Sequence, residues 1–355
     1  ALTTDAKARE AVQLRINEVS LEAAKYAAPD EFSNLIQGIG GEGLNAFTAY
    51  DVTCYMNSFP SYQMERWLTL YADRLTNPVF RSFQAELENV FEEYNMYLDD
   101  NSTHTRNFIF GKLYEGHAYA RDIIGYPEDL KNPKMRQLID FYNTWYVPNN
   151  MALILVGDFD TEAAKPLIEK TFGKLQARPL PQRTQYPTTA FSQDERYSAK
   201  LGYMPELYIA YNGVPVGDKD ELLLDFLGEI LSNSMQIGLL DELTLDNKLM
   251  YAGAANDVRR DQGRFLVIAV PYMDAETQTY TSLKETEKLV NEAIQQLVNG
   301  DISEELVEAV RQNFYQEFDR TMEYPEMKVQ LLQNAFTYQQ SIEEMLQHKE
   351  RVAAI

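Results

Sequence analysis

Apolar positions recur along this chain with two spacings, one typical of helices and the other of strands. In the first half, an apolar residue every three or four positions predicts helices over residues 6–27, 30–39, 63–75, 83–98, 132–145 and 161–172. Residues 45–58 follow a glycine-rich turn and are rich in Phe, Thr, Val, Cys and Tyr, which predicts a strand. The apolar run 151–156 ends at Gly157 and predicts a buried strand.

The same alternation of elements recurs after residues 176–191, a proline-containing polar segment that predicts a surface linker. Strands are predicted over residues 207–212, 249–258 and 264–271, and helices over residues 219–232, 236–246, 275–298, 303–322 and 328–340. Both halves therefore mix antiparallel strands with helices packed on one face, which is the α+β class. We place a first domain at residues 1–178, a linker at 179–193 and a second domain at 194–355.

Composition narrows the possible partners. The chain has 355 residues, 45% of them apolar, and a net charge of −22. This charge argues against nucleic acid and anionic membranes as partners. It favours basic peptides as ligands, and an ordinary acidic soluble protein is the alternative. No apolar run approaches the roughly 18 residues of a membrane span. A single cysteine, Cys54, excludes an internal disulfide and is interpreted as a small core residue.

The helix predicted over residues 83–98 carries two glutamates that are candidates for a site. Glu86 and Glu93 are seven residues apart, close to two helical turns, so both project from one stripe with Val90 between them. Glu92, one position earlier, points elsewhere. Glutamates on helices are mostly solvated, so the pattern alone does not assign a function.

The segments around this helix carry a resemblance. They read GGEGLNAFTAYDVTCYMNSFP before it, and GHAYARDIIG, FYNTWYVPNNMALILVGDFD and FGKL after it. In this order they resemble the pitrilysin/insulinase family of zinc metallopeptidases, the inverzincins, over nearly the whole chain. Residues 5–28 match an extra helical segment of its bacterial members. The resemblance implies a tandem of two homologous domains, with residues 1–178 the remainder of the peptidase domain and residues 194–355 non-catalytic.

The resemblance also implies roles for single residues. Glu93 matches the third zinc ligand, and Glu86 matches an acid that braces the site. Tyr251 matches a tyrosine that stabilises an oxyanion, although Thr244 stands where its usual arginine companion would be, and a core residue at a strand start is the alternative. The edge strand that binds an extended peptide is matched by Asn45, Ala46, Phe47 and Thr48, and a plain hairpin strand is the alternative.

The family's H-x-x-E-H motif is missing from this sequence. The three histidines, His104, His117 and His348, contain no pair four residues apart. In the family this motif precedes the glycine-rich loop, so we expect either a truncated chain or a divergent member that never had it. We expect zinc in the intact enzyme and none bound to this chain.

Three functions remain open at this point. The first is one half of a zinc metalloendopeptidase, inactive as given, whose partners are a peptide substrate and the second half, in the same longer chain or a separate subunit. The second is a non-catalytic subunit that binds peptides or completes a partner's chamber, and the third is a structural assembly subunit. We expect a bacterial protein, periplasmic or cytoplasmic, without nucleic acid or a membrane span.

Overall fold

Two compact units make up the chain, as seen in a computed structural model that describes residues 5–28, 30–80, 82–131 and 134–355. One unit contains Ala1–Thr103 and Arg121–Gln185, and the other contains His104–Ala120 and Tyr186–Ile355. Each combines helices with an antiparallel sheet, which confirms the predicted α+β class. The second unit takes in residues 104–120, which the sequence pattern placed in the first domain, and the homology of the two domains stays a prediction.

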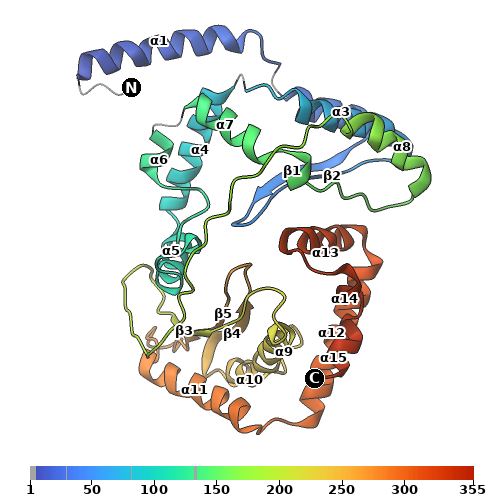
Figure 1. The fold of residues 1–355 in the computed structure, drawn as a ribbon. Coiled ribbons are helices and arrows are strands. Elements are labelled where there is room, and N and C mark those ends of the chain that lie inside the picture. The colour runs from blue at the N-terminus through green and yellow to red at the C-terminus, as the bar shows by residue number, and fades with distance from the viewer. Residues whose placement is uncertain (1–4, 29, 81, 132–133) are drawn as a thin grey trace. The chain divides into compact units, whose positions relative to one another are not determined.

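The first unit combines a β-hairpin with helices, of which α2, α3 and α8 form its main core (Figure 1). Its elements are α1 (Ala6–Ala24), α2 (Glu31–Gly38), β1 (Glu42–Thr48), β2 (Thr53–Ser58), η1 (Ser61–Gln63), α3 (Met64–Thr76), α4 (Phe83–Leu98), α6 (Pro127–Lys131), α7 (Met135–Trp145), η3 (Pro148–Asn150) and α8 (Thr161–Phe172). These confirm the predicted helices. Residues 132–133, where the predicted helix over 132–145 would begin, lie outside the described residues.

The predicted single strand over residues 45–58 is wrong, because the chain turns back within it. The Ala49 N–H donates to the Val52 carbonyl at 2.8 Å and closes a four-residue turn between β1 and β2. The turn is fixed by Asp51, whose carboxylate lies 3.1 Å from the guanidinium of Arg183. Asp51 is a residue type that favours turns, but without a neighbouring Gly, Asn or Pro it was not enough to predict one here.

The buried strand predicted over residues 151–156 is also not found, since these residues join no sheet among the described part of the chain. Leu153 and Leu155 nevertheless pack against the main core of this unit. That core contains Ile36, Ile39, Met64, Trp67, Leu68, Tyr71 and Ala164. The apolar run thus contributes partly buried residues to the core, but it is neither fully buried nor a strand.

The second unit is built on a three-stranded antiparallel sheet in the order β3-β5-β4. Its elements are η2 (Ala118–Ala120), β3 (Leu207–Asn212), α9 (Glu221–Leu231), α10 (Leu239–Leu245), β4 (Leu249–Asp257), β5 (Arg264–Pro271), α11 (Leu283–Asn299), α12 (Glu304–Glu323), α13 (Pro325–Tyr338), α14 (Ile342–Leu346) and α15 (His348–Ala353). Helices α9, α10 and α11 pack on the sheet around Leu240, Val267 and Val290. These residues are 0 to 1% exposed, so the core of this unit is dry.

Two helices in the second half of the chain start at other residues than predicted, each for a local reason. Residues 275–282 are not helical, because the Asp274 side chain accepts the N–H groups of Glu276 and Thr277 in a turn, and Ser282 then caps α11. Pro325 begins α13 as its first residue, a position that proline favours, so this helix starts earlier than residue 328. Helix α5 (Asn101–Leu113), in the first half of the chain, was not predicted, and neither were the short helices α6, α14 and α15.

Residues 104–120 are attached to the second unit through Arg264, whose side chain is buried. Its Nη2 donates to the carbonyl of Leu113 at 2.8 Å and to that of Thr189 at 2.6 Å. The guanidinium also lies over the ring of Tyr114, whose hydroxyl donates to Asp257 at 2.6 Å. One buried cation therefore joins three segments that are far apart in sequence.

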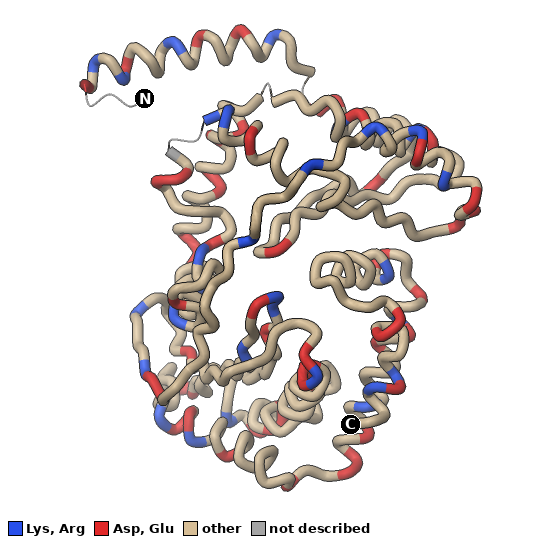
Figure 2. The backbone as a smooth tube through the Cα atoms, viewed as in Figure 1, with Lys and Arg blue, Asp and Glu red and all other residues tan. Residues whose placement is uncertain are grey.

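Acidic residues lie on the helices of both units (Figure 2), in keeping with the net charge of −22. Across the part of the chain that the structure describes, every helix is too short or too polar to cross a membrane.

One of these acids, Asp225 on α9, gives a pH-dependent prediction. Burial raises the pKa of Asp225, although its carboxylate accepts a hydrogen bond from Asn256 Nδ2 at 2.9 Å. The folded chain thus holds this proton more tightly than the unfolded chain. Ionisation therefore costs stability above the folded pKa, and the cost disappears below about pH 4, where the unfolded carboxyl is also protonated.

We expect Asp225→Asn to stabilise the protein at neutral pH by about 1 kcal/mol, because it keeps the bond to Asn256 and removes the buried charge. Thermal unfolding followed by circular dichroism measures the effect, which should vanish as the pH falls toward about 4. Asp194→Asn, at an exposed position, is the matched control. A variant less stable than wild type at neutral pH would contradict the prediction.

Candidate functional site

Helix α4 carries the two glutamates in the predicted arrangement. It is helical over all of Phe83–Leu98, so Glu86 and Glu93 share one stripe, about 10 Å apart along the axis. Both side chains are exposed, and α4 buries none of its described residues fully. Glu86 lies in the first turn, where the helix dipole favours a negative charge. The stripe is therefore accessible and available for a ligand.

Each glutamate has one neighbour on its own helix. Tyr97 donates its hydroxyl to Glu93 Oε1 at 3.1 Å, and Asn89 donates its amide to Glu86 Oε2 at 3.2 Å. A carboxylate has two oxygens with about four acceptor positions, so one such bond leaves most of its capacity unused. Both contacts hold the side chains along the helix surface. Neither was predicted from the sequence, although the spacings of four and three residues could have suggested them.

Strand β1, which carries the four predicted peptide-binding residues, pairs with β2 alone among the described residues. The bond from Ala49 to Val52 fixes the alternation of the ladder. In this register Phe47 faces Cys54 in a hydrogen-bonded pair, whereas Ala46 and Thr48 direct their backbone groups away from β2. The edge of β1 is thus open, as predicted, while its role in binding peptides stays a prediction.

The Asn45 side chain occupies part of this open edge. Its Oδ1 accepts the N–H of Ala46 at 2.8 Å. An added strand would compete with Asn45 for that donor, whereas the N–H of Thr48, at a non-hydrogen-bonded position of the ladder, points away from β2. The sequence did not predict this contact, because it is made between neighbouring residues and depends on the side-chain rotamer.

The hairpin is positioned by polar contacts from α3. The Asn57 side chain accepts from Trp67 Nε1 at 3.0 Å and from the Tyr71 hydroxyl at 2.8 Å. Two residues before Asn57 on β2, the Tyr55 hydroxyl lies 2.8 Å from the hydroxyl of Tyr146, which follows α7. These contacts hold β2 in place, and both β1 and β2 are edge strands of this two-stranded sheet among the described residues.

Tyr251 lies in β4 opposite Val270, in the second unit. Its side chain is 53% exposed, so the interpretation as a core residue is wrong. The hydroxyl lies where a side chain at Gly253 would be, since a Cβ built there would come within 2.7 Å of it. The absence of a side chain at Gly253 thus allows the ring to lie along its own strand. A role in stabilising an oxyanion stays a prediction.

The donor set of the described residues does not make a zinc site. No three His, Cys, Asp or Glu side chains among them lie close enough together to hold a metal ion. His117 is buried, accepting the Tyr119 N–H at Nδ1, while its Nε2 lies 3.5 Å from Asp261. His348 stacks on Phe318, and burial lowers its pKa. Glu93 can supply one carboxylate ligand, and zinc requires further donors from outside the described residues.

Two family models match the chain. The model of the insulinase family, peptidase family M16, matches residues 17–126. The model of the peptidase M16 inactive domain matches residues 135–314, just over half of the chain. All the predicted site residues on β1 and α4 lie within the first match, and Tyr251 lies within the second.

Curated relatives with similar sequences are named zinc proteases. Zinc protease PqqE of Helicobacter pylori is 23% identical over 265 residues, covering 72% of this chain and 59% of that protein. The uncharacterized zinc protease YmxG of Bacillus subtilis is 24% identical over 224 residues, covering 62% of this chain and 54% of that protein. The matched region thus spans somewhat more than half the length of these relatives.

Solved structures show the same fold. A protease from Helicobacter pylori matches with a TM-score of 0.80 at 20% identity, covering 92% of this chain and 79% of that one. The first half of the periplasmic protease PqqL from Escherichia coli matches with a TM-score of 0.67 at 20% identity, covering 90% and 72%. At such identities the likeness shows the fold alone.

Proposed function

This chain belongs to the M16 peptidase family, and on that basis we propose that it is one half of a zinc-dependent metalloendopeptidase that hydrolyses peptides. In this proposal Glu93 supplies one carboxylate ligand to the metal, and Glu86 braces the site from the same helical stripe. The remaining ligands and the second half come from the same longer protein or from a partner subunit.

The proposal rests on two features that occur together in the first unit. An open strand edge on β1 and an accessible glutamate stripe on α4 both lie within residues 17–126, the part that matches the insulinase family. An open edge binds an extended peptide through its backbone and is tolerant of sequence, which suits a peptidase substrate. We therefore assign extended peptide segments as the substrate class.

A second candidate is a non-catalytic subunit of the same family that binds peptides or completes a partner's chamber. It is favoured by the match of residues 135–314 to the M16 inactive domain. Such a subunit would use the edge of β1 in the same way and would leave the chemistry to its partner.

The test uses the complete gene product that contains this sequence, purified and dialysed against a metal-free buffer. We expect about one equivalent of zinc by elemental analysis and cleavage of a quenched fluorescent peptide, because a complete catalytic site takes three protein ligands and one metal. A chelator should abolish the cleavage, and added zinc should restore it. A protein that binds the same peptide but holds no metal and cleaves nothing would support the second candidate instead.

A further inference from the structure

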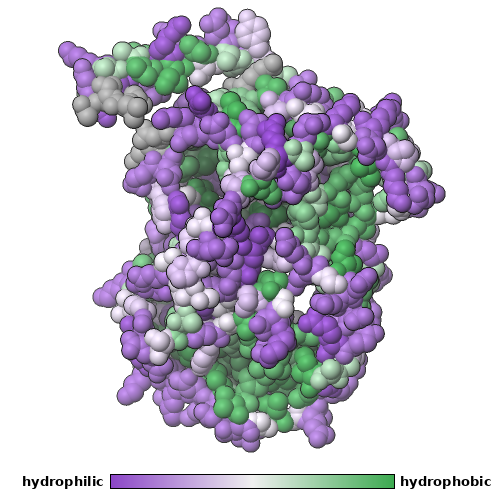
Figure 3. All heavy atoms as spheres, viewed as in Figure 1, coloured by the Kyte–Doolittle hydropathy of each residue, from purple (hydrophilic) through white to green (hydrophobic). Residues whose placement is uncertain are grey.

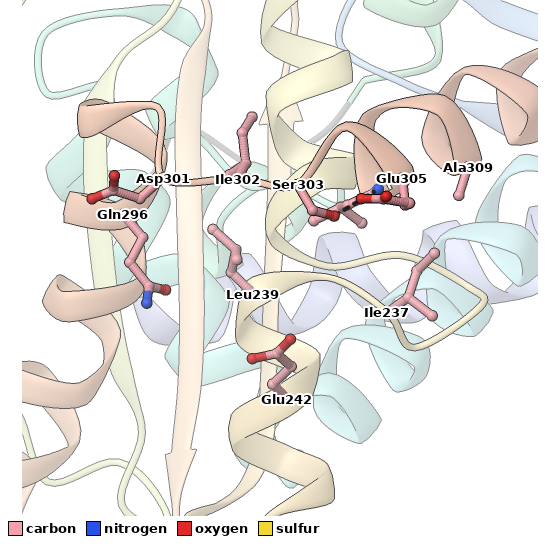
Figure 4. A pocket seen from close by; sticks show the side chains of 10 residues that line it. Ile237, Leu239, Glu242, Gln296, Asp301, Ile302, Ser303, Glu305 and Ala309 are labelled. Carbon is pink, nitrogen blue, oxygen red and sulfur yellow. Dashed lines mark hydrogen bonds between the residues drawn. The ribbon is translucent and has the colours of Figure 1, made fainter.

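The second unit has an open cavity of about 550 Å³ that the proposed function does not use (Figure 4). Its walls come from the start of α10, the end of α11 and the first turns of α12. In Figure 3, apolar side chains gather on this unit around α9 and α10. The volume lies within the range of ordinary ligand sites.

The floor of the cavity is apolar and anchored in the core. Leu239, Ile302 and Leu306 line it, and all three also pack against the cluster around Phe226 and Val310. A floor held in this way keeps its shape before a ligand arrives, which reduces the ordering cost of binding.

The polar part of the wall consists mainly of hydrogen-bond acceptors. Figure 4 shows the carboxylates of Glu242, Asp301 and Glu305 on three sides of Leu239. The lining contains no lysine or arginine, and no ion pair joins these three acids to another described residue. The nearby Lys248 is paired with Asp246 at 2.9 Å. An acceptor-rich wall over an apolar floor suits a ligand that is cationic, rich in donors and partly apolar.

Other ligand classes fit less well. The three acids do not form a group that could hold a metal ion. Anionic ligands are disfavoured by three carboxylates in a chain with a net charge of −22. A lysine or arginine side chain fits both parts of the wall, because its aliphatic stem can pack on the floor while its charged end reaches the rim.

We propose that this cavity is a docking site for a basic segment of a partner protein, in which lysine or arginine alternates with apolar residues. The charges of Glu242, Asp301 and Glu305 select the basic residues, and the floor of Leu239, Ile302 and Leu306 takes the apolar one. This docking site is separate from the edge of β1 and does not depend on peptidase activity.

The test measures binding of a short fluorescein-labelled peptide of alternating leucine and lysine to the whole chain by fluorescence anisotropy. The double variant Glu242→Gln/Glu305→Gln should weaken binding about tenfold, since each accessible charge pair contributes up to about 1 kcal/mol. The matched control is Glu292→Gln/Glu304→Gln, which removes the same charge from α11 and α12 but not from the cavity wall. The control should bind as the wild type does.

A second variant tests the cavity itself without changing charge. Ala309→Trp fills the space beside the floor and should also weaken binding about tenfold, about 1.4 kcal/mol in binding free energy. If Glu242→Gln/Glu305→Gln and the control Glu292→Gln/Glu304→Gln weakened peptide binding equally, the peptide would be attracted by the overall negative charge, and the proposal would be overturned. Displacement of the peptide by spermine at equal concentration would overturn it too, because the site would then prefer a free polyamine.

Discussion

Under the proposed function, Glu93→Gln in the complete gene product is expected to lower zinc affinity and chelator-sensitive cleavage by about a hundredfold or more. Loss of a residue that only orients a ligand already costs about 10 to 100-fold, and loss of the ligand's charge should cost at least as much. Glutamine keeps the length of the side chain and the bond from Tyr97, so α4 should remain folded. Zinc content after dialysis and the rate of peptide cleavage are the two measurements.

Glu92→Gln is the matched control for this prediction. Glu92 is exposed on the same helix, one position off the stripe, and carries the same charge. We expect it to keep wild-type zinc content and activity. If Glu92→Gln lost as much as Glu93→Gln, the loss would come from the helix or from its overall charge, and Glu93 would not be a metal ligand.

Arg264→Met is expected to lower the free energy of unfolding of the second unit by about 3 kcal/mol. Methionine fills much of the space but donates no hydrogen bond, so the carbonyls of Leu113 and Thr189 lose the guanidinium. Each buried acceptor left without a partner costs about 1 to 3 kcal/mol. Hydrogen–deuterium exchange measures the effect locally, as lost protection in residues 104–120 and in β5.

The two units provide an internal reference for this variant. Trp67 and Trp145 both belong to the first unit, so tryptophan fluorescence during urea unfolding follows that unit. Arg196→Met removes an exposed arginine of the second unit and should change the free energy of unfolding by less than about 0.5 kcal/mol. Unchanged protection of residues 104–120 in Arg264→Met would show that other contacts attach this segment.

The sequence predicted the elements that depend on local patterns. Helix α4 was placed at its observed limits because its apolar spacing is regular, and strands β3 and β5 were placed at theirs. The turn between β1 and β2 was missed because it contains a single turn-favouring residue, Asp51, whose ion-pair partner Arg183 lies far along the chain. The run 151–156 was misassigned because apolar composition signals burial and contains no information about strand partners.

The candidate site also combines features that the sequence could predict with features that it could not. The shared stripe of Glu86 and Glu93 follows from helical geometry, so a spacing of seven residues was enough to predict it. The contact of Asn45 with Ala46 depends on a rotamer, and the exposure of Tyr251 depends on the missing side chain at Gly253. The carboxylates of the cavity come from α10, from the loop that follows α11, and from α12. Only the tertiary packing brings them together.

The attachment of residues 104–120 to the second unit also constrains the order of events during synthesis. Leu113 and Arg264 are 151 residues apart, so at the usual rates of translation roughly 8 to 30 s pass before the arginine follows. Tyr114 and Tyr119 are 0% and 2% exposed in the finished fold, and their cluster includes Leu266 of β5, so their burial is incomplete during that interval. The nascent chain therefore exposes an aromatic segment until β5 has been made, and transiently exposed apolar surface of this kind is prone to aggregation.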